Sequence, residues 1–213
     1  LSSTGILDMA DVPKSLLVIG SGAVGGEFAS MYSRFGSKVT IIEVLPRIVP
    51  IEDEEISREL AASFKRQGIA VYVETRVERV TKSDSGVEVV ARAVGDRTET
   101  FRAEKLLLAV GRRPLSERIG LEGLGIATDR GYISVDPYMC TNVPGVYAIG
   151  DVVPTPWLAH VASAEGIVAV EHMAGKETRP SNYDQAPGCT YSMPELASIG
   201  LTERAAREAG YAV

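Results

Sequence analysis

The sequence predicts an α/β fold in which a βαβ unit on a parallel sheet is followed by a β-meander. Three observations support this prediction. A short continuous apolar run at residues 15–20 is typical of a strand that is covered on both faces. A stretch of helical length and then a β-branched run follow it. After Gly68 the hydrophobic period changes to two, as in strands with one buried face.

The βαβ unit is expected from the first 43 residues. The first strand, SLLVIG at residues 15–20, lies between Pro13 and the helix expected at residues 23–35. That helix ends at Gly36, because glycine readily adopts the left-handed backbone that closes a helix. The run KVTIIE at residues 38–43 then returns as the second strand.

A second helix is expected at residues 53–67, ahead of the meander. Ile56, Leu60 and Phe64 recur every four residues, which places them on one face, and acids occupy the first turn, where the helix dipole favours them. Gly68 ends this helix. The expected strands after it are residues 70–80, 86–94, 98–103 and 105–111.

Composition and charge are typical of a soluble globular protein. Hydrophobic residues make up 45% of the chain and charged residues 23%, and no apolar run approaches the roughly 20 residues that span a bilayer. The formal net charge of -6 argues against a nucleic-acid partner. Residues 1–14 do not resemble a signal peptide, and Cys140 and Cys189 match neither a disulfide framework nor a zinc spacing. We therefore expect a cytoplasmic or organelle-matrix protein.

Three glycines follow the first expected strand with the spacing G-x-G-x-x-G. Gly20 permits a tight turn, Gly22 lets the backbone approach a pyrophosphate, and Gly25 lets helix and strand pack closely. The free N–H groups at the helix start then hold the negative charge. An acid, Glu43, stands 18 residues beyond Gly25, at the end of the second strand. This context predicts a Rossmann-like dinucleotide site, and the alternative is an ordinary glycine turn.

Glu43 indicates which dinucleotide is bound. A carboxylate at this strand end accepts hydrogen bonds from the ribose hydroxyls of an adenosine and repels a 2′-phosphate. No arginine pair is present to reverse that preference, so NAD is expected rather than NADP. The alternative, that Glu43 is a solvated acid at a strand edge, stays open, because Arg47, the only basic residue nearby, follows four residues later.

Four further stretches resemble a known family. They are LLLAVGRRP (106–114), TNVPGVYAIGD (141–151), PWLAHVASAEGIVAVEHMAG (156–175) and PGCTYSMPELASIGLTE (187–203). The first two are expected to be strands that end in Gly-Arg-Arg-Pro and Gly-Asp. The chain is similar to the pyridine nucleotide-disulfide oxidoreductases, flavoproteins with an FAD domain, an NAD(P) domain and a dimerisation domain. Within that family, LAH followed by EG favours the members that oxidise dihydrolipoamide over glutathione or mercuric reductases.

The resemblance implies FAD and NAD as cofactors and assigns residues to each. Asp151 would accept hydrogen bonds from the ribityl or pyrophosphate region of FAD. The backbone of Leu158 and Ala159 would lie along the flavin at a helix start. Glu27 matches a carboxylate near the nicotinamide carboxamide, and Gly111 matches a backbone position beside NAD.

Two positions depart from the family pattern. Ala23 stands where glutathione reductases have a tyrosine lid, so the pocket is expected to be open. Leu115 replaces an asparagine, which puts the contacts of that asparagine in doubt. Among the other candidate residues, His160 is expected to be packed or hydrogen-bonded within its helix, and His172 is expected to face solvent.

The resemblance also implies residues that this chain lacks. The reaction of the family requires a Cys-x4-Cys pair, a base histidine and a first glycine motif for FAD, and none of them occurs here. The chain is therefore expected to be an internal fragment that is inactive alone, with no catalytic residue and no metal site. Its expected parts are an NAD domain (1–111), the closing part of an FAD domain (112–180) and the start of an α+β dimerisation domain (181–213). The resemblance implies a homodimer that acts on dihydrolipoamide or on the lipoyl domain of a 2-oxoacid dehydrogenase complex. The alternative in another class is a nucleotide-binding module without turnover.

Overall fold

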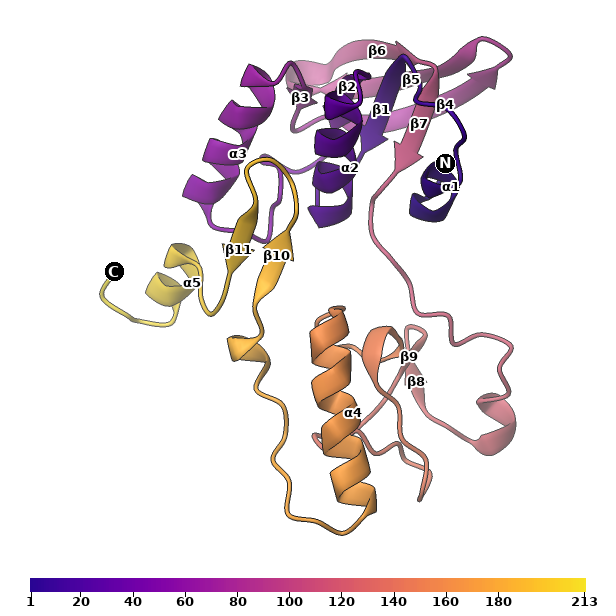
Figure 1. Cartoon of the computed structure of the whole chain (residues 1–213), viewed down its shortest axis with the longest axis vertical. Coiled ribbons are helices and arrows are strands. Elements are labelled where there is room, and N and C mark those ends of the chain that lie inside the picture. Colours follow the sequence, from indigo (N-terminus) through magenta and orange to yellow (C-terminus); the bar gives the residue numbers. More distant parts are fainter. The chain divides into compact units, whose positions relative to one another are not determined.

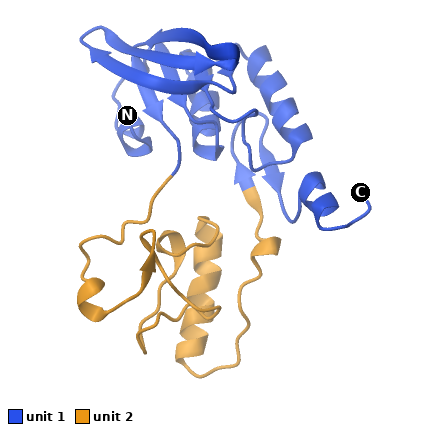
Figure 2. Ribbon diagram, turned by 180° about the vertical axis from the view of Figure 1, so that it is seen from behind, with its two compact units in different colours: residues 1–111, 189–213 blue, residues 112–188 orange.

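A four-stranded parallel sheet forms the centre of the first of two compact units in the computed structural model, which describes residues 1–213 (Figures 1 and 2). Residues 1–111 and 189–213 make up the first unit, and residues 112–188 make up the second. The strand order is β3-β2-β1-β7. Its strands are β1 (Ser15–Ile19), β2 (Lys38–Ile42), β3 (Ala70–Tyr72) and β7 (Lys105–Leu108).

Both faces of this sheet are covered. Successive side chains along a strand point to opposite faces, so neighbouring residues of β1 pack in different clusters. Val18 packs in a cluster with Leu60 and Phe64 of α3 (Glu54–Arg66), on the face that also holds α2 (Ala23–Arg34). Leu17 packs on the other face, in a cluster with Phe101 of the meander. The meander consists of β4 (Arg76–Ser83), β5 (Gly86–Ala93) and β6 (Arg97–Ala103), which pair antiparallel. The α/β prediction is therefore confirmed.

The remaining elements are short, apart from α4. In the first unit they are α1 (Ser3–Leu7), η1 (Val94–Asp96), β11 (Leu196–Ser198) and α5 (Glu203–Glu208). In the second unit they are η2 (Glu122–Leu124), β8 (Thr128–Asp129), β9 (Tyr132–Ile133), η3 (Gly150–Val152), α4 (Ala159–Met173) and η4 (Tyr183–Gln185). Strand β10 (Gly188–Thr190) crosses the boundary and pairs with β11. No helix is both long and apolar enough to span a membrane.

The expected strand over residues 70–80 is wrong as a single element. The structure breaks it after Tyr72 and starts β4 at Arg76, in a different sheet. Glu74 at the break adopts a positive φ of 47°. The backbone N–H of Thr75 donates to the carbonyl of Glu43, so this segment still follows β2 before it turns away.

The strand expected within residues 141–151 is also not formed. Its one bridge joins Tyr147 to Cys140, and η3 begins at Gly150. Ile149 is extended, with φ of -141°, so the local conformation suits a strand. A strand also requires neighbouring strands to complete its ladder of backbone hydrogen bonds, and within the second unit Tyr147 has only this single bridge.

The helix predicted at residues 53–67 is confirmed, but one of its expected core positions is wrong. Leu60 and Phe64 are fully buried, whereas Ile56 is 41% exposed. Ser57 is buried in place of Ile56, and its hydroxyl donates to the carbonyl of Val49 at 3.3 Å. The inward face of the first turn of α3 therefore contacts the backbone of the loop at Val49, and no apolar cluster forms there.

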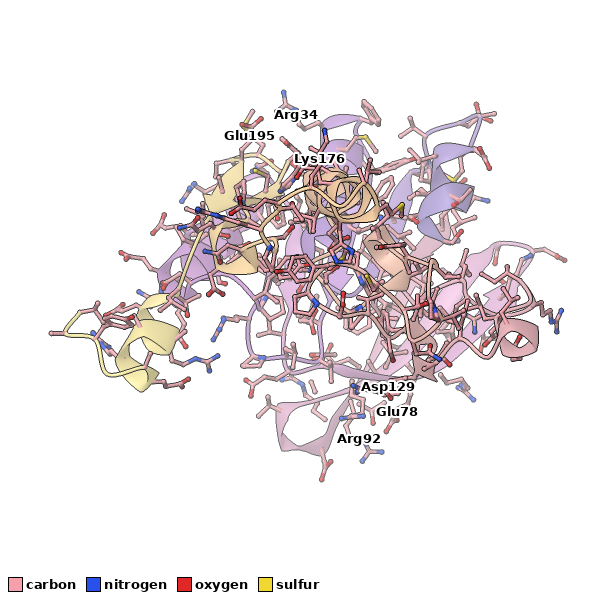
Figure 3. The ribbon with its side chains drawn as sticks, turned by 90° about the horizontal axis from the view of Figure 1, so that it is seen from below. Arg34, Glu78, Arg92, Asp129, Lys176 and Glu195 are labelled. Atoms are coloured by element: carbon pink, nitrogen blue, oxygen red, sulfur yellow. The ribbon has the colours of Figure 1, made fainter.

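Ion pairs connect neighbouring strands on the exposed face of the meander. Arg92 of β5 donates through Nε to Glu78 of β4 at 2.6 Å, and Figure 3 shows these two side chains close together. Arg102 of β6 donates to Glu88 of β5 through Nε at 2.9 Å, and its Nη2 lies 2.6 Å from the same carboxylate. Such exposed cross-strand pairs help to set the register more than they stabilise the fold.

Residues 191–193 dock onto the helices of the first unit. The backbone N–H of Tyr191 donates to Oε1 of Glu27 at 2.9 Å, and that of Met193 donates to Oγ of Ser30 at 3.0 Å. Nε2 of Gln67 in turn donates to the Met193 carbonyl at 2.6 Å. These bonds to α2 and to the end of α3 hold residues 191–193 against the first unit, to which residues 189–213 belong.

Asp53 joins the starts of two helices. Its side chain accepts from the backbone N–H of Glu55 in α3 at 3.0 Å and from that of Glu203 in α5 at 2.9 Å. The bonds from Glu203 and then Glu55 favour the charged carboxylate and lower the pKa of Asp53 below its ordinary value of 3.8.

Replacing Asp53 by alanine is expected to lower the melting temperature at pH 7 and to loosen α5. A depressed pKa means that the stabilisation is complete above the unfolded value and is lost as the pH falls through the folded value. The difference between wild type and Asp53→Ala should therefore shrink once the pH drops below 3.8. Thermal melts followed by circular dichroism at pH 7, 5 and 3 test this, with the exposed Asp11→Ala as the control. A difference that is equal at all three pH values would show that the carboxylate charge is not involved.

Candidate functional site

The connection from β1 to α2 brings the three glycines of the G-x-G-x-x-G pattern together. Gly20 has φ of +94°, and a Cβ there would lie 2.5 Å from the carbonyl oxygen of Ala109, beyond β7. A Cβ at Gly25 would overlap the carbonyl oxygen of Gly20, because α2 packs directly against the end of β1. Both positions therefore require glycine for the packing of the protein itself.

Gly22 differs, because its surroundings are open. It caps α2 with φ of -64° and with no side-chain capping bond, and a Cβ there would meet no protein atom within 4 Å. The first helical bond runs from the N–H of Gly26 to the carbonyl of Gly22, so the N–H groups of the first turn lack helical partners. An uncapped helix start beside open space is the arrangement that binds a phosphate.

Glu43 follows β2 directly and is only 6% exposed. Its Oε2 accepts from the backbone N–H of Ser21 at 2.8 Å and from the Ser21 hydroxyl at 2.7 Å. Its Oε1 accepts from the N–H of Leu45 at 2.9 Å. A carboxylate offers about four acceptor positions, so one remains on Oε1 for an incoming hydroxyl. Glu43 thus lies against the glycine loop, and it is not a solvated acid at a strand edge.

Two more of the residues assigned to NAD lie in the first unit. Glu27, one turn into α2, is half-buried and accepts from Tyr191 through Oε1. Gly111 is exposed and has φ of +128°. Ala23, the first residue of α2, carries only a methyl group beside the open space at Gly22. No bulky side chain at this position closes the helix start.

The residues assigned to FAD lie in the second unit. The carboxylate of Asp151, in η3, accepts from Nη1 of Arg112 at 3.0 Å. Leu158 caps α4 without a side-chain bond, and α4 begins at Ala159 as expected. The first helical bond runs from the N–H of Ala162 to the Leu158 carbonyl, so α4 also starts with free donors. Leu115 is exposed.

The two histidines reverse their expected environments. His160 is exposed in the first turn of α4. His172 is half-buried, and its Nδ1 lies 2.9 Å from the hydroxyl of Tyr147. Its ring stacks on Tyr138 at a centroid distance of 4.9 Å. Tyr147 pairs with Cys140, two residues after Tyr138, and this pairing brings both rings to His172 near the end of α4.

A groove of about 910 Å³ runs between α3 and β3. Arg58, Lys65 and Tyr72 are among the residues that line it. None of the glycines of the loop and neither of the acids assigned to NAD is part of its lining. The groove therefore shares no residue with the glycine loop or with the acids assigned to NAD, although Arg47, four residues after Glu43, lines it.

Two contributors to these sites were not predicted from the sequence. Ser21 lies inside the glycine pattern and binds Glu43 through both its backbone N–H and its hydroxyl. Arg112 belongs to the Gly-Arg-Arg-Pro segment, but its partner Asp151 lies 39 residues away. A polar residue between the first two glycines was the only available signal for Ser21, and no local signal identifies the partner of Arg112.

Comparison with known sequences shows which proteins this chain is similar to. The family model described as pyridine nucleotide-disulphide oxidoreductase matches residues 1–166. Dihydrolipoyl dehydrogenases of Chlorobaculum tepidum and Bacillus subtilis are each 44% identical to the chain, over all of its length and 45% of theirs. The mitochondrial dihydrolipoyl dehydrogenase of Pisum sativum is 41% identical over 99% of the chain and 42% of its own length.

Solved structures give the same relationship. The HOCl-induced flavoprotein disulfide reductase RclA from Escherichia coli superposes with a TM-score of 0.89 at 31% identity, over 99% of this chain and 48% of that one. LpdA from Mycobacterium tuberculosis superposes with a TM-score of 0.88 at 30% identity, over 98% of this chain and 45% of that one. The chain spans about half the length of the relatives it matches. On the family match and these identities, the chain belongs to the pyridine nucleotide-disulphide oxidoreductase family.

Proposed function

We propose that this chain is the NAD-binding part and a portion of the FAD-binding part of an NAD-dependent dihydrolipoyl dehydrogenase. That enzyme passes electrons from dihydrolipoamide through an enzyme disulfide and FAD to NAD. Residues 1–111 form the NAD domain, residues 112–180 the closing part of the FAD domain, and residues 181–213 the start of the dimerisation domain. The identity of 44% to dihydrolipoyl dehydrogenases, against 31% to RclA, supports this member of the family.

The open space at Gly22 is the observation that carries the proposal. Gly20 and Gly25 are accounted for by internal packing, but nothing in the protein occupies the direction of a Cβ at Gly22. Glycine is required there only if a ligand approaches the backbone. The uncapped start of α2, next to it, provides donors for a pyrophosphate.

Glu43 and Arg47 favour NAD over NADP. The free acceptor position on Glu43 Oε1 suits a ribose hydroxyl, and its negative charge would repel a 2′-phosphate. Arg47 does not compensate for that charge. Its Nη1 donates to Glu54 at 2.9 Å and its Nη2 to the carbonyl of Pro50 at 3.2 Å, so its guanidinium is held at the start of α3.

The two cofactors, when bound, would supply the electron transfer between dithiol and nicotinamide. The chain itself binds and orients. The start of α2 holds the pyrophosphate of NAD, and Glu27 and Gly111 border the nicotinamide end. The free donors at the start of α4 fit an anionic flavin edge, and Asp151 fits the ribityl–pyrophosphate region of FAD.

The partners follow from the same proposal. We infer that the substrate is dihydrolipoamide, or a lipoyl domain of a 2-oxoacid dehydrogenase complex, and that the full protein is a homodimer. Relatives named dihydrolipoyl dehydrogenase cover the whole chain. The redox cysteines and the base of that reaction would lie in parts of the protein outside these 213 residues.

Replacing Glu43 by alanine is expected to weaken NAD binding by roughly 10- to 100-fold. The variant loses a charge-assisted hydrogen bond to a ribose hydroxyl, worth about 1.5–3 kcal/mol. NADP binding should change little, because the lost repulsion offsets the lost bonds. Titration calorimetry of the chain with both nucleotides measures the two affinities.

Ser21→Ala is the matched control for that experiment. It removes one hydrogen bond to the Glu43 carboxylate, the 2.7 Å bond from the Ser21 hydroxyl, and leaves the carboxylate in place. It should lower both affinities slightly and leave their ratio unchanged. Equal losses for NAD and NADP in Glu43→Ala would mean that Glu43 only braces the glycine loop and has no role toward the ribose.

A further inference from the structure

A carboxylate lies in the core of the second unit. Glu165, in the middle of α4, is 0% exposed, although α4 is otherwise rich in alanine and valine. Burying a charge is costly unless hydrogen bonds compensate for the lost hydration. The partners of Glu165 therefore indicate what the buried carboxylate does in the fold.

Both oxygens of Glu165 are hydrogen-bonded. Oε2 accepts from the backbone N–H of Gly150 at 2.7 Å, and Oε1 accepts from the hydroxyl of Tyr183 at 3.0 Å. Burial, together with the bond to Glu165, raises the pKa of Tyr183 to about 12. The phenol thus remains a protonated donor at any physiological pH. The Glu165 side chain thus connects the turn at Gly150 to the segment at Tyr183 by hydrogen bonds.

The helix approaches this turn closely on both sides of Glu165. A Cβ at Gly150 would lie 3.4 Å from the Cβ of Ala162, and a Cβ at Gly166 would lie 3.3 Å from Cδ1 of Ile149. Small residues at 162 and 166 therefore let α4 pack closely against Gly150 and the side chain of Ile149. Glu165 lies between them in the sequence, which brings its carboxylate within reach of the Gly150 N–H.

Gly150 directly precedes Asp151, and its φ of +73° starts the turn η3. The carbonyl of Gly150 accepts from the N–H of Val153 at 2.9 Å, which closes the turn. Arg112 holds the side chain of Asp151. The main chain before Asp151 is thus held by Glu165, and the carboxylate of Asp151 is held by Arg112.

We propose that Glu165 is a positioning residue for the FAD-binding turn. Its buried carboxylate holds the Gly150 N–H, and through it sets the direction in which Asp151 meets the ribityl–pyrophosphate region of FAD. This inference rests on the proposed function. A methionine at position 165 would fill the same volume but would leave the Gly150 N–H and the Tyr183 hydroxyl without an acceptor.

The test compares FAD affinity in the protein expressed from the full reading frame that contains this chain. Apoprotein is titrated with FAD, and flavin fluorescence gives the dissociation constant. Glu165→Met is expected to weaken FAD binding by roughly 10- to 100-fold, because a buried donor next to Asp151 loses a charged acceptor. Glu165→Gln should recover most of that loss. Its carbonyl can accept from Gly150, and its amide can donate to the Tyr183 oxygen.

Two controls separate positioning from general loosening of the core. Glu171→Ala removes another carboxylate of α4, one that accepts from Thr178 at 2.7 Å and does not contact the turn, and it should leave FAD affinity unchanged. Tyr183→Phe breaks only the Oε1 bond and should cost far less affinity than Glu165→Met. If Tyr183→Phe costs as much as Glu165→Met, or if Glu165→Met binds FAD as wild type does, the proposal is overturned.

Hydrogen exchange in the wild type adds a measurement that needs no variant. The Gly150 amide should be strongly protected in the folded protein, and rapid exchange there would also overturn the inference. Failure of the proposed function looks different, because the wild-type protein would then bind no FAD, or would bind FAD but not oxidise dihydrolipoamide, whatever the variants do. In that case the protection of Gly150 would still report on its bond to Glu165.

Discussion

Replacing Gly22 by valine is expected to abolish NAD binding and to leave the chain folded. The backbone at Gly22 has φ of -64°, which any residue adopts, and no protein atom lies within 4 Å of the Cβ position. The valine methyl groups would occupy the space through which the pyrophosphate approaches the start of α2. Affinity should fall by roughly 100-fold or more, which corresponds to about 2.7 kcal/mol or more.

The effect on stability should be small by comparison. Valine is a poorer N-cap than glycine, with a cost of about 1 kcal/mol, and a change of this size lowers the melting temperature of a domain by several degrees. Gly25→Ala is the matched contrast, because its new Cβ would overlap the carbonyl oxygen of Gly20. That variant should lose folding stability first, and NAD binding only as a consequence.

Calorimetry with NAD and thermal melts without ligand measure the two effects separately. The expected pattern is lost binding with a near-normal melt for Gly22→Val, and a lowered melt for Gly25→Ala. If Gly22→Val instead unfolds without ligand, Gly22 serves the turn alone, and the ordinary glycine turn becomes the better interpretation.

The 213-residue chain, purified by itself, is expected to hold no FAD and to show no lipoamide or diaphorase activity. Asp151 and the Leu158–Ala159 backbone would form one wall of the flavin site. The relatives of this chain are about twice its length, and we place the other walls in that remaining sequence. The protein from the full reading frame should carry stoichiometric flavin and be active.

The second unit has the features of an incomplete domain. Its only sheet pairs two-residue strands, β8 and β9. Helix α4 exposes large apolar side chains, with Ile167 61% exposed and Val170 62% exposed. Neighbouring apolar side chains of this size are normally covered by another part of a protein. Residues 141–213 should therefore promote association of the isolated chain.

Absorbance at the flavin bands and light scattering after size exclusion test this expectation. The full-length protein is assayed with dihydrolipoamide and with glutathione disulfide, which also distinguishes the proposed activity from that of a glutathione reductase. Stoichiometric FAD on the isolated chain would show that the flavin site is complete within these residues and would refute the proposed division.

The elements of the first unit that the sequence predicted well are those whose signal is local. β1 and β2 are continuous apolar runs because α2 and α3 cover one face of the sheet and the meander covers the other. The capping residues of α3 lie directly at its ends, and its buried residues Leu60 and Phe64 are one turn apart. These patterns depend on neighbours within a few residues, so periodicity detects them.

The elements that it predicted poorly depend on distant partners. Residues 70–80 alternate as one strand, but the backbone of Glu43 holds Thr75, and the chain then turns into a second sheet. Residues 141–151 have strand composition, and Ile149 has an extended backbone, but their one strand-like pairing is the single bridge from Tyr147 to Cys140. Composition records the preference of a segment for a conformation, and hydrogen bonding to a partner decides whether a strand forms.

The candidate site divides in the same way. The sequence alone determined the glycine loop and the acid at the end of β2, because the order of strand, turn, helix and strand places them together in any parallel βαβ unit. Only the tertiary structure decided that Ser21 engages Glu43, that Arg112 holds Asp151, and that Glu165 joins Gly150 to Tyr183. The members of these pairs lie 15 to 39 residues apart, and a hydrogen bond across that distance leaves no periodic pattern in the chain. Folding brings such residues together, and for Glu43 and Glu165 the burial of the carboxylate then makes its hydrogen bonds necessary.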